Sequence, residues 1–423
     1  MRFVTQHVFI CGAKSIGQYG GYETFVEKLL EQHEGLDGIE YHVACKHNGE
    51  GYMDERRLSG VSETVLDEAG EVTEFRYRGA HVFKLKVPNI GPAVAVWYDA
   101  HAVRYALRYC REHNIEAPIF YILTCRIGPV IGRYKRELEA MGGKLFLNPD
   151  GHEWKRAKWS APIRRYWKLS EGLMVKHSDL VICDSENIRR YIREEYKAFD
   201  PETAFIAYGS DLTPSALPDD DPSFRGWLEE KGLQPEKYYL IVGRFVLENN
   251  YETVIREFMA SDTDKTLAII TNSNEKLMRS LEERLHFKKD PRIRFVGTVY
   301  DQALLKKIRE NAWGYFHGHE VGGTNPSLLE ALGSTKVNLA LDVGFNREVA
   351  EDGALYWTKQ PGNLRQVIEQ AEQLSEQARS ALGEKARERI RTAYSWERIG
   401  DQYAAVFLRT PALALHGESG GDR

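Results

Sequence analysis

The 423-residue sequence has few cysteines, and none of them are paired at metal-binding or redox spacing. Their number is odd and no CxxC motif occurs, which argues against a disulfide framework, a zinc site or a thioredoxin-like centre. We expect reduced thiols, packed in the core, at all five positions, which are Cys11, Cys45, Cys110, Cys125 and Cys183.

The sequence also lacks a long hydrophobic run and an excess of charge of either sign. No stretch reaches the roughly 18 apolar residues that a membrane-spanning helix needs. The opening MRFVTQHVFICG lacks the order of a signal peptide. With 57 basic and 62 acidic residues the formal charge is −5, which does not favour nucleic-acid binding through bulk positive charge. These absences predict a cytoplasmic protein with no nucleic-acid partner, which can contact a membrane only at its surface.

What is present is the pattern of an α/β protein with two similar halves. Apolar residues make up 42% and charged residues 28% of the chain, as in globular proteins. Short β-branched runs alternate with helical periodicity, which favours βαβ units and mainly parallel sheets. We expect strands at 8–10, 41–45, 81–87, 119–123, 144–147 and 180–183, and again at 238–242, 267–271, 293–296 and 314–317.

A proline-rich, acidic stretch, TPSALPDDDP, separates the two halves. Its aspartates are more typical of a solvated linker than of a metal site, which needs rigid, convergent oxygens. A ligand cleft is expected between two such halves. The predicted division is an N-terminal Rossmann-like domain at 1–213, a linker at 214–222, a C-terminal Rossmann-like domain at 223–395, a helix at 396–412 that returns to the N-terminal domain, and a disordered tail at 413–423.

Two glycine-rich turns lie where a strand gives way to a helix. The first, GQYGGYETF at 17–25, lets backbone N–H groups approach an anion or a sugar oxygen. Its spacing is neither GxGxxG nor GxxxxGK[ST], so a dinucleotide or Walker-type site is not supported. An ordinary βα turn without a ligand is equally compatible with the residues.

The second, HGHEVGGTNPSLLEALG at 317–333, offers Thr324 or Asn325 as helix cap and Pro326 in the first turn. Its free amides could hold a phosphate, and Glu330 could accept a hydrogen bond from a sugar hydroxyl. An ordinary capped helix with a solvated glutamate is the alternative. His317 and His319 alone are weak indicators of a metal.

A third stretch, GRFVLENN at 243–250, follows the first strand of the second half. Arg244 stands where a guanidinium fork could clamp a diphosphate, although a plain surface arginine fits as well.

Together these pieces resemble the retaining glycosyltransferases of family 4, which have the GT-B fold of two Rossmann-like parallel-sheet domains facing a central cleft. Longer stretches resemble a narrower branch, the bacterial β-1,4-rhamnosyltransferases that initiate capsule and cell-wall rhamnan. They are FVEKL, NIGPAVAVWYDA, LNPDGHEWKRAKWS, VICDSENIRRYI, TNPSLLEAL and LDVGFNREV. The resemblance extends to about Trp396.

The resemblance implies roles for particular residues. Asp150 and Glu23 would belong to the catalytic centre, and Arg244 would bind the departing diphosphate. Further donor contacts would come from Gly20, Gly21, Tyr208, Gly209, Gly323, Thr324, Asn325 and Glu330. Two departures from the family pattern stand out. Asn249 occupies the place of a second diphosphate cation, a lysine, and Gly322 that of a glutamate, with Glu320 nearby.

The segment 151–168, GHEWKRAKWSAPIRRYWK, combines cations with aromatic rings. This composition is typical of a surface that contacts anionic head groups. We predict contact with the membrane or a lipid-linked acceptor through Trp154, Lys155, Arg156, Lys158, Trp159, Arg164 and Arg165. A domain-packing helix, a site for the acceptor diphosphate alone and a single-strand nucleic-acid surface are the alternatives.

The resemblance therefore implies a metal-independent enzyme without a cofactor, peripheral to the cytoplasmic face of the membrane. It would transfer L-rhamnose from dTDP-β-L-rhamnose to a polyprenyl-diphosphate-linked glucose or N-acetylglucosamine. One alternative is a glycosyltransferase that uses another donor, such as UDP-glucose or UDP-N-acetylglucosamine. A second is a membrane-docked scaffold that binds a nucleotide sugar without turnover. A nicotinamide oxidoreductase lacks its GxGxxG motif.

Overall fold

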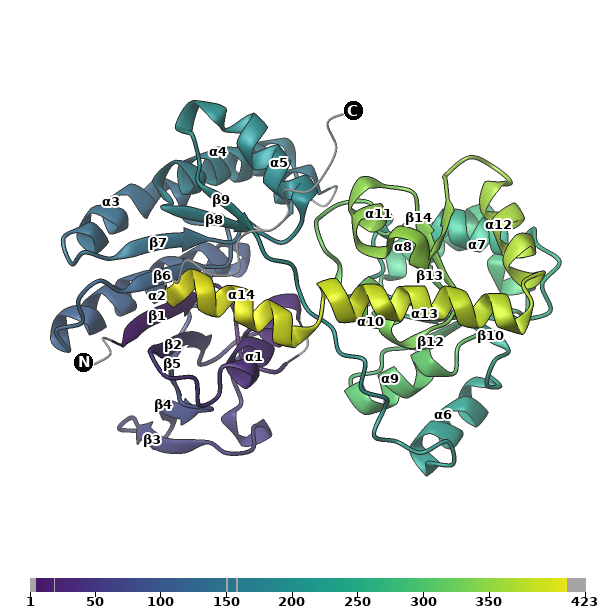
Figure 1. The fold of residues 1–423 in the computed structure, drawn as a ribbon, viewed down its shortest axis with the longest axis horizontal. Coiled ribbons are helices and arrows are strands. Elements are labelled where there is room, and N and C mark those ends of the chain that lie inside the picture. Colours follow the sequence, from purple (N-terminus) through teal and green to yellow (C-terminus); the bar gives the residue numbers. More distant parts are fainter. Residues whose placement is uncertain (1–4, 19, 150, 157–158, 409–423) are drawn as a thin grey trace. The chain divides into compact units, whose positions relative to one another are not determined.

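The computed structural model describes residues 5–18, 20–149, 151–156 and 159–408. Two compact units make up the chain. The first joins the N-terminal residues up to Tyr208 with the segment from Trp396 onward, and the second runs from Gly209 to Ser395. Each unit is an α/β sandwich in which helices cover both faces of one sheet (Figure 1).

The first unit is built on a nine-stranded sheet in the order β3-β4-β5-β2-β1-β6-β7-β8-β9. Its strands are β1 Gln6–Cys11, β2 Ile39–Lys46, β3 Ser62–Leu66, β4 Val72–Tyr77, β5 Ala80–Leu85, β6 Ile119–Ile122, β7 Lys144–Leu147, β8 Leu180–Cys183 and β9 Thr203–Phe205. Pairing is parallel from β5 to β9 across the sheet, and antiparallel where β4 meets β3 and β5. Sequence analysis missed β3, β4 and β9. Of these, β3 is exposed along its whole length and shows no buried face.

Two groups of helices cover the faces of this sheet. Buried residues of α2, α3, α4 and α5 pack with Phe9, Phe120 and Leu147 on one face. On the other face, Phe25 of α1 meets Tyr121 and Tyr403. The helices are α1 Gly21–Gln32, α2 Val94–Glu112, α3 Gly128–Glu139, α4 Ala161–His177, α5 Glu186–Glu195 and α14 Trp396–Leu408.

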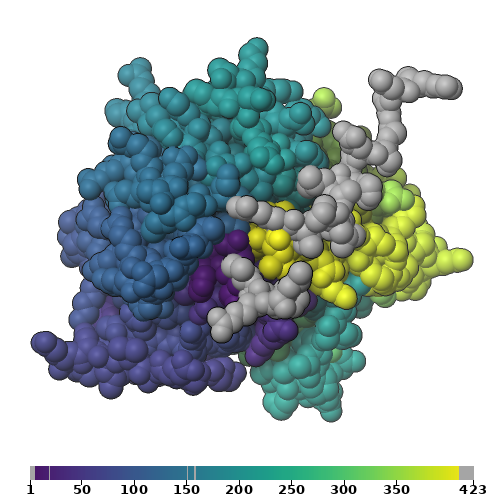
Figure 2. Space-filling model, turned by 60° about the vertical axis from the view of Figure 1, so that its left-hand side comes forward, coloured from purple at the N-terminus to yellow at the C-terminus, as the bar shows by residue number. Residues whose placement is uncertain are grey.

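The last helix of the chain, α14, thus belongs to the first unit. In Figure 2 its yellow atoms lie beside the dark purple of the first strand and helix, which it contacts. The Tyr403 hydroxyl shares a 2.8 Å hydrogen bond with that of Tyr121. His33 of α1 is 2.8 Å from the carbonyl of Gly400. The tail expected at 413–423, and residues 409–412 of the expected helix, lie outside the described residues.

The second unit has a six-stranded, entirely parallel sheet in the order β12-β11-β10-β13-β14-β15. Helices α7, α8 and α12 pack on one face and α6, α9 and α10 on the other. The elements are β10 Tyr238–Val242, β11 Thr266–Ile270, β12 Ile293–Gly297, β13 Gly314–His317, β14 Asn338–Leu341, β15 Leu355–Trp357, α6 Pro222–Lys231, α7 Tyr251–Met259, α8 Glu275–Leu285, α9 Gln302–Glu310, α10 Pro326–Ser334, α11 Gly344–Ala350, α12 Asn363–Glu372 and α13 Glu376–Ala393.

Residues 214–222, expected to link the halves, run along α9 within the second unit. The Ser215 hydroxyl donates to the carbonyl of Ala303 at 2.7 Å, and Asp219 pairs with Lys307 at 2.5 Å. Asp221 caps α6 by accepting from the N–H of Ser223. These acidic side chains therefore act as ion-pair partners and as a helix cap.

Helix α3 approaches α4 so closely that Gly128 has no room for a side chain. A Cβ at this position would lie 2.3 Å from the Ser170 carbonyl oxygen. We expect Gly128→Ala to lower the thermal unfolding midpoint, with a cost of about 1–3 kcal/mol from overpacking.

Gly226, an exposed residue inside α6, provides the control. No atom lies within 4 Å of a Cβ built there, and alanine is the better helix former by about 1 kcal/mol. Gly226→Ala should therefore raise the midpoint. Thermal unfolding of both variants is monitored by circular dichroism. Equal effects of the two substitutions on the midpoint would contradict the packing argument.

Candidate functional site

In each unit, the candidate residues lie at the carboxyl ends of the central parallel strands. In the first unit the turn after β1 is tied down by the side chain of Glu23. Its Oε1 accepts from the Lys14 N–H at 3.0 Å. A Cβ on Gly20, the N-cap of α1, would lie 1.9 Å from Glu23 Oε2. Glycine at this position therefore lets the carboxylate fold back over the loop.

The other residues predicted for the first unit have different surroundings. Gly21 is exposed, and no atom lies within 4 Å of a Cβ built on it. Tyr208 is buried with its ring edge on Phe25 at 5.7 Å, and Gly209 begins the second unit. Asp150 and Lys158 lie outside the described residues. Pro149, just before Asp150, has its carbonyl 3.5 Å from the Cys125 sulfur.

The basic, aromatic segment divides into a packed part and an exposed part. The Trp154 indole donates to the Tyr191 hydroxyl at 3.2 Å, and the Trp159 indole donates to Glu153 at 2.9 Å. Arg156 lies against the same Glu153.

The exposed part is formed by the N-terminal half of α4. Arg164 and Arg165 are exposed and pair with no carboxylate among the described residues. Apolar side chains accompany them, because Ile163 is 40% and Leu169 60% exposed. Lys155 is also exposed, with its ammonium 5.2 Å from the Trp154 ring. The arrangement is a small cationic and apolar surface.

In the second unit, two loops from neighbouring strands are locked together. β10 pairs with β13, and the Asn249 side chain bridges the loops that follow them. Asn249 donates to the Arg244 carbonyl at 2.8 Å, and its Oδ1 lies 2.6 Å from Nδ1 of His319. A Cβ on Gly318 would lie 2.4 Å from the Asn249 carbonyl oxygen. The asparagine that replaces the expected lysine therefore has a structural part in this edge.

Arg244 itself is exposed and has no carboxylate partner among the described residues. An unpaired guanidinium at the carboxyl edge of a parallel sheet can bind an anion with two parallel hydrogen bonds. Asn325 caps α10 by accepting from the Ser327 N–H at 2.9 Å, and Pro326 occupies the first turn. One donor that sequence analysis assigned to a phosphate is therefore taken by Asn325. Gly323 and Thr324 precede it and are buried.

Glu330 is held by a residue that sequence analysis missed. Nη2 of Arg309, on α9, lies 2.5 Å from Glu330 Oε2. The arginine side chain is only 4% exposed, whereas that of Glu330 is 37% exposed. The buried cation thus fixes the carboxylate with part of its surface open to solvent, which suits a group that accepts hydrogen bonds from hydroxyls. No local sequence signal marks Arg309, because it looks like any other helical arginine.

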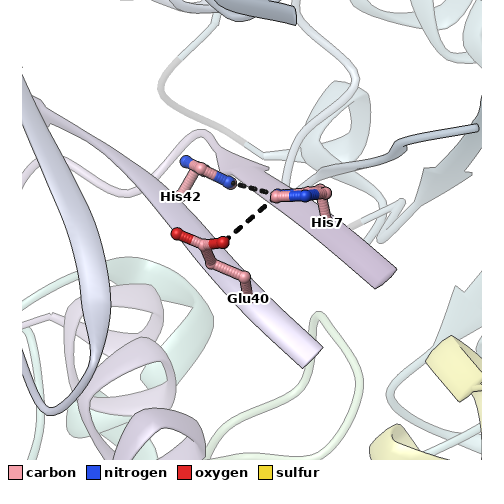
Figure 3. Close-up of side chains that lie close together, drawn as sticks. All are labelled: His7, Glu40 and His42. Carbon is pink, nitrogen blue, oxygen red and sulfur yellow. Dashed lines mark hydrogen bonds and ion pairs between the residues drawn. The ribbon is translucent and has the colours of Figure 1, made fainter. Parts of the chain in front are cut away.

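A separate cluster, at the amino ends of β1 and β2, joins His7, Glu40 and His42 (Figure 3). Nδ1 of His7 is 3.0 Å from Nε2 of His42 and 3.6 Å from Glu40. His42 continues the row to His81 at 3.1 Å. His81 then meets Glu74 at 3.0 Å. If each neutral ring donates toward the Glu74 end, one tautomer per histidine satisfies the whole row without a metal. A second group of side chains whose possible ligand atoms lie close together is His47, Asp67 and Glu71.

The described residues include no helix that is both long and apolar enough to cross a bilayer.

His317 is buried at the end of β13, and burial holds its pKa well below the usual range. It thus stays neutral within the core.

Comparisons with known proteins identify the fold. Residues 5–211 match the family model described as a domain of unknown function, DUF1972. The curated protein sequences compared contain no match to this chain.

Solved structures are similar over almost the full length. Sucrose-phosphate synthase from Thermosynechococcus elongatus has a TM-score of 0.72 at 18% identity, covering 96% of this chain and 98% of that one. A glycosyltransferase from Rickettsia africae gives 0.68 at 11%, covering 96% and 98%. HepE from Anabaena, in complex with UDP, gives 0.63 at 13%, covering 96% and 100%. The chain therefore has the GT-B fold, as the sequence resemblance implied.

The histidine row predicts a pH-dependent stability. Burial, followed by the charge of His81, lowers the pKa of His42 from 6.5 to about 2. The unfolded chain takes up this proton near pH 6.5 and the folded chain does not. The contribution of His42 to the free energy of unfolding is therefore fully present above pH 6.5. Below that pH it falls by about 1.4 kcal/mol per pH unit.

His42→Gln should flatten this dependence in urea unfolding between about pH 6.5 and 5. Other buried histidines leave a residual slope. Glutamine in place of His113, which is exposed on the same unit, should keep the native slope. An unchanged slope in the His42 variant would refute the assignment.

Proposed function

We propose that this protein is a retaining glycosyltransferase that uses a nucleotide sugar. The observation that carries the proposal is the edge of the second unit. There Arg244, which has no carboxylate partner within the described part of the chain, lies in the loop after β10, and Arg309 holds Glu330 on α10. The Ser327 hydroxyl ties α10 to the carboxyl end of β10 by donating to the Val242 carbonyl at 3.0 Å. A cation for a diphosphate and a fixed acceptor for sugar hydroxyls are what a nucleotide sugar needs.

The chemistry proposed for these groups is charge stabilisation and positioning. Arg244 would bind the diphosphate as it leaves and stabilise its growing charge. Glu330 would hold the ribose, and deoxyribose offers it only the 3′-hydroxyl. Gly323, Thr324 and Asn325 would line the donor. Asp150 and Glu23, from the first unit, would act toward the acceptor hydroxyl. No metal or cofactor is part of the proposal.

The sequence resemblance favours L-rhamnose from dTDP-β-L-rhamnose as the donor and a polyprenyl-diphosphate-linked glucose or N-acetylglucosamine as the acceptor. A UDP-sugar donor is the second candidate. It is favoured by HepE, which was solved with UDP and with UDP and glucose, and by a trehalose-6-phosphate protein of E. coli bound to UDP-2-fluoro glucose, which has a TM-score of 0.67.

The function is tested with dTDP-L-rhamnose, UDP-glucose and UDP-N-acetylglucosamine, each with lipid-diphosphate-linked glucose or N-acetylglucosamine. We expect transfer of rhamnose, read by mass spectrometry. Arg244→Ala should lower kcat/KM about 100-fold or more, because the leaving diphosphate loses its cation. Arg365→Ala, an exposed arginine of the same unit paired with Glu369, is the matched control and should retain activity.

Two results would change the assignment. Transfer from UDP-glucose and none from dTDP-rhamnose would reject rhamnose as the donor. Failure of every donor, together with normal cellular polysaccharide in an Arg244→Ala strain and none in a deletion strain, would favour the scaffold.

We further propose that the exposed N-terminal half of α4 binds the cytoplasmic face of the membrane. The Arg164→Gln, Arg165→Gln double variant should float less with vesicles that contain anionic lipid. Each cation near such a surface contributes about 1 kcal/mol, so the loss is about 30-fold in partitioning. Arg133 and Lys176, both exposed on the same unit, give the control double variant. Equal flotation of the two variants would count against the surface.

A further inference from the structure

Lys46 ends β2 and is a buried lysine that forms no ion pair among the described residues. Only 4% of the residue is exposed. Its ammonium donates to the Glu50 carbonyl at 3.1 Å, and among the described residues it has no carboxylate within ion-pair distance. Lys84, on the neighbouring strand β5, shows the usual solution. Its side chain is 6% exposed, and its ammonium is 2.6 Å from Glu55. A buried cation left without such a partner is costly.

A second unpaired lysine lies beside the first. Lys14, in the turn after β1, accepts from the Lys46 N–H through its carbonyl at 2.7 Å. Its side chain runs over Gly51, where a Cβ would lie 3.9 Å from the Lys14 ammonium. Both ammonium groups therefore lie against the same turn, Glu50 and Gly51. Lys14 has no carboxylate partner among the described residues either.

Arg126 brings a third cation to this edge. It follows β6, which pairs with β1. Its Nη1 is 3.1 Å from Oδ2 of Asp99, and the Thr124 hydroxyl donates to the same oxygen at 2.7 Å. Asp99 is completely buried and its Oδ1 has no hydrogen-bond partner among the described residues. The Arg126 side chain is 24% exposed, and its ion pair with Asp99 holds the guanidinium at this edge.

The charges of these groups act on one another. Burial first, and then the neighbouring Lys14, lower the pKa of Lys46. Glu50 acts in the opposite direction, Arg126 adds to the lowering, and Asp99 opposes it. Lys14 and Lys46 thus bring two cations without an ion-pair partner among the described residues to the carboxyl ends of β1 and β2, next to the Arg126–Asp99 pair.

We propose that Lys14, Lys46 and Arg126 form a binding site for a diphosphate in the first unit, separate from the donor groups of the second unit. A diphosphate supplies negative charge for the two lysines and acceptor oxygens that all three side chains can share. It can come from a lipid-linked acceptor or from a soluble diphosphate. The assignment of this diphosphate to a lipid-linked acceptor rests on the proposed function. The existence of the anion site does not.

The test measures binding of inorganic pyrophosphate and of farnesyl diphosphate to the full chain by calorimetry. Arg244→Ala is the background, so that the second unit does not contribute. Pyrophosphate should bind the Arg244→Ala protein. Adding Lys46→Met or Lys14→Met should weaken pyrophosphate binding about tenfold or more, as expected for loss of one charge-assisted hydrogen bond. Lys84→Met is the matched control and should bind normally.

Stability distinguishes binding from a structural role. Lys46→Met removes a buried cation without orphaning a carboxylate, so the unfolding midpoint should not fall. Lys84→Met leaves Glu55 unpaired and should lower it. Lys14→Met, at a half-buried position, tests the site independently of the folding of the Lys46 variant.

The proposal is overturned if pyrophosphate does not bind the Arg244→Ala protein, or if the Lys46 and Lys14 variants bind as tightly as the Lys84 variant. Tighter binding of farnesyl diphosphate than of pyrophosphate supports the site and assigns it to a lipid-linked ligand. Equal binding supports the site and assigns it to a soluble diphosphate. Absence of sugar transfer with these binding results intact would remove the proposed function and leave the anion site.

Discussion

Parallel strand pairing around a central first strand is the constraint on which both units depend. β1 lies between β2 and β6, and β10 lies between β11 and β13. In each sheet the chain runs outward on one side of this first strand and then returns to start again on the other. Loops from non-consecutive strands therefore meet at one edge. That edge collects Lys14, Lys46 and Arg126 in the first unit, and the Arg244 and His319 loops in the second.

In both units, a glycine lets a neighbouring polar group approach the backbone closely and fixes the conformation of the loops at this edge. Gly318 lies against the Asn249 carbonyl, and Gly20 lies against the Glu23 carboxylate. In each place a missing side chain lets a neighbouring polar group fold over a loop and hold it. The loops are therefore shaped before any ligand binds, which reduces the conformational entropy that binding would cost.

The sequence predicted most of the parallel strands and the capped helix at Pro326, because apolar runs and an Asn-Pro pair are local signals. It missed the short parallel strands β9, β14 and β15. It could not predict Arg309 or Asp99. Their partners, Glu330 and Arg126, lie 21 and 27 positions away and depend on the packing of helices. Lys46 was missed for a similar reason, since a lysine at a strand end is ordinarily solvated. Strand β3 is exposed along its whole length and offers no apolar face as a signal. Strand β4 buries only Phe75 and Tyr77, an alternation too short to be recognised from the sequence.

The return of α14 to the first unit makes the second unit an insertion within the first. Ser210 and Ser395, at the two ends of the inserted segment, form a parallel bridge, so the chain enters and leaves the second unit at adjacent points. The first unit is accordingly not a continuous stretch of sequence. A fragment cut at residue 211, where the family match ends, would lack Tyr403 and Phe407 and would uncover Phe25 and Tyr121. The extent of the first unit is therefore set by the packing of these aromatic side chains, which come from both ends of the chain.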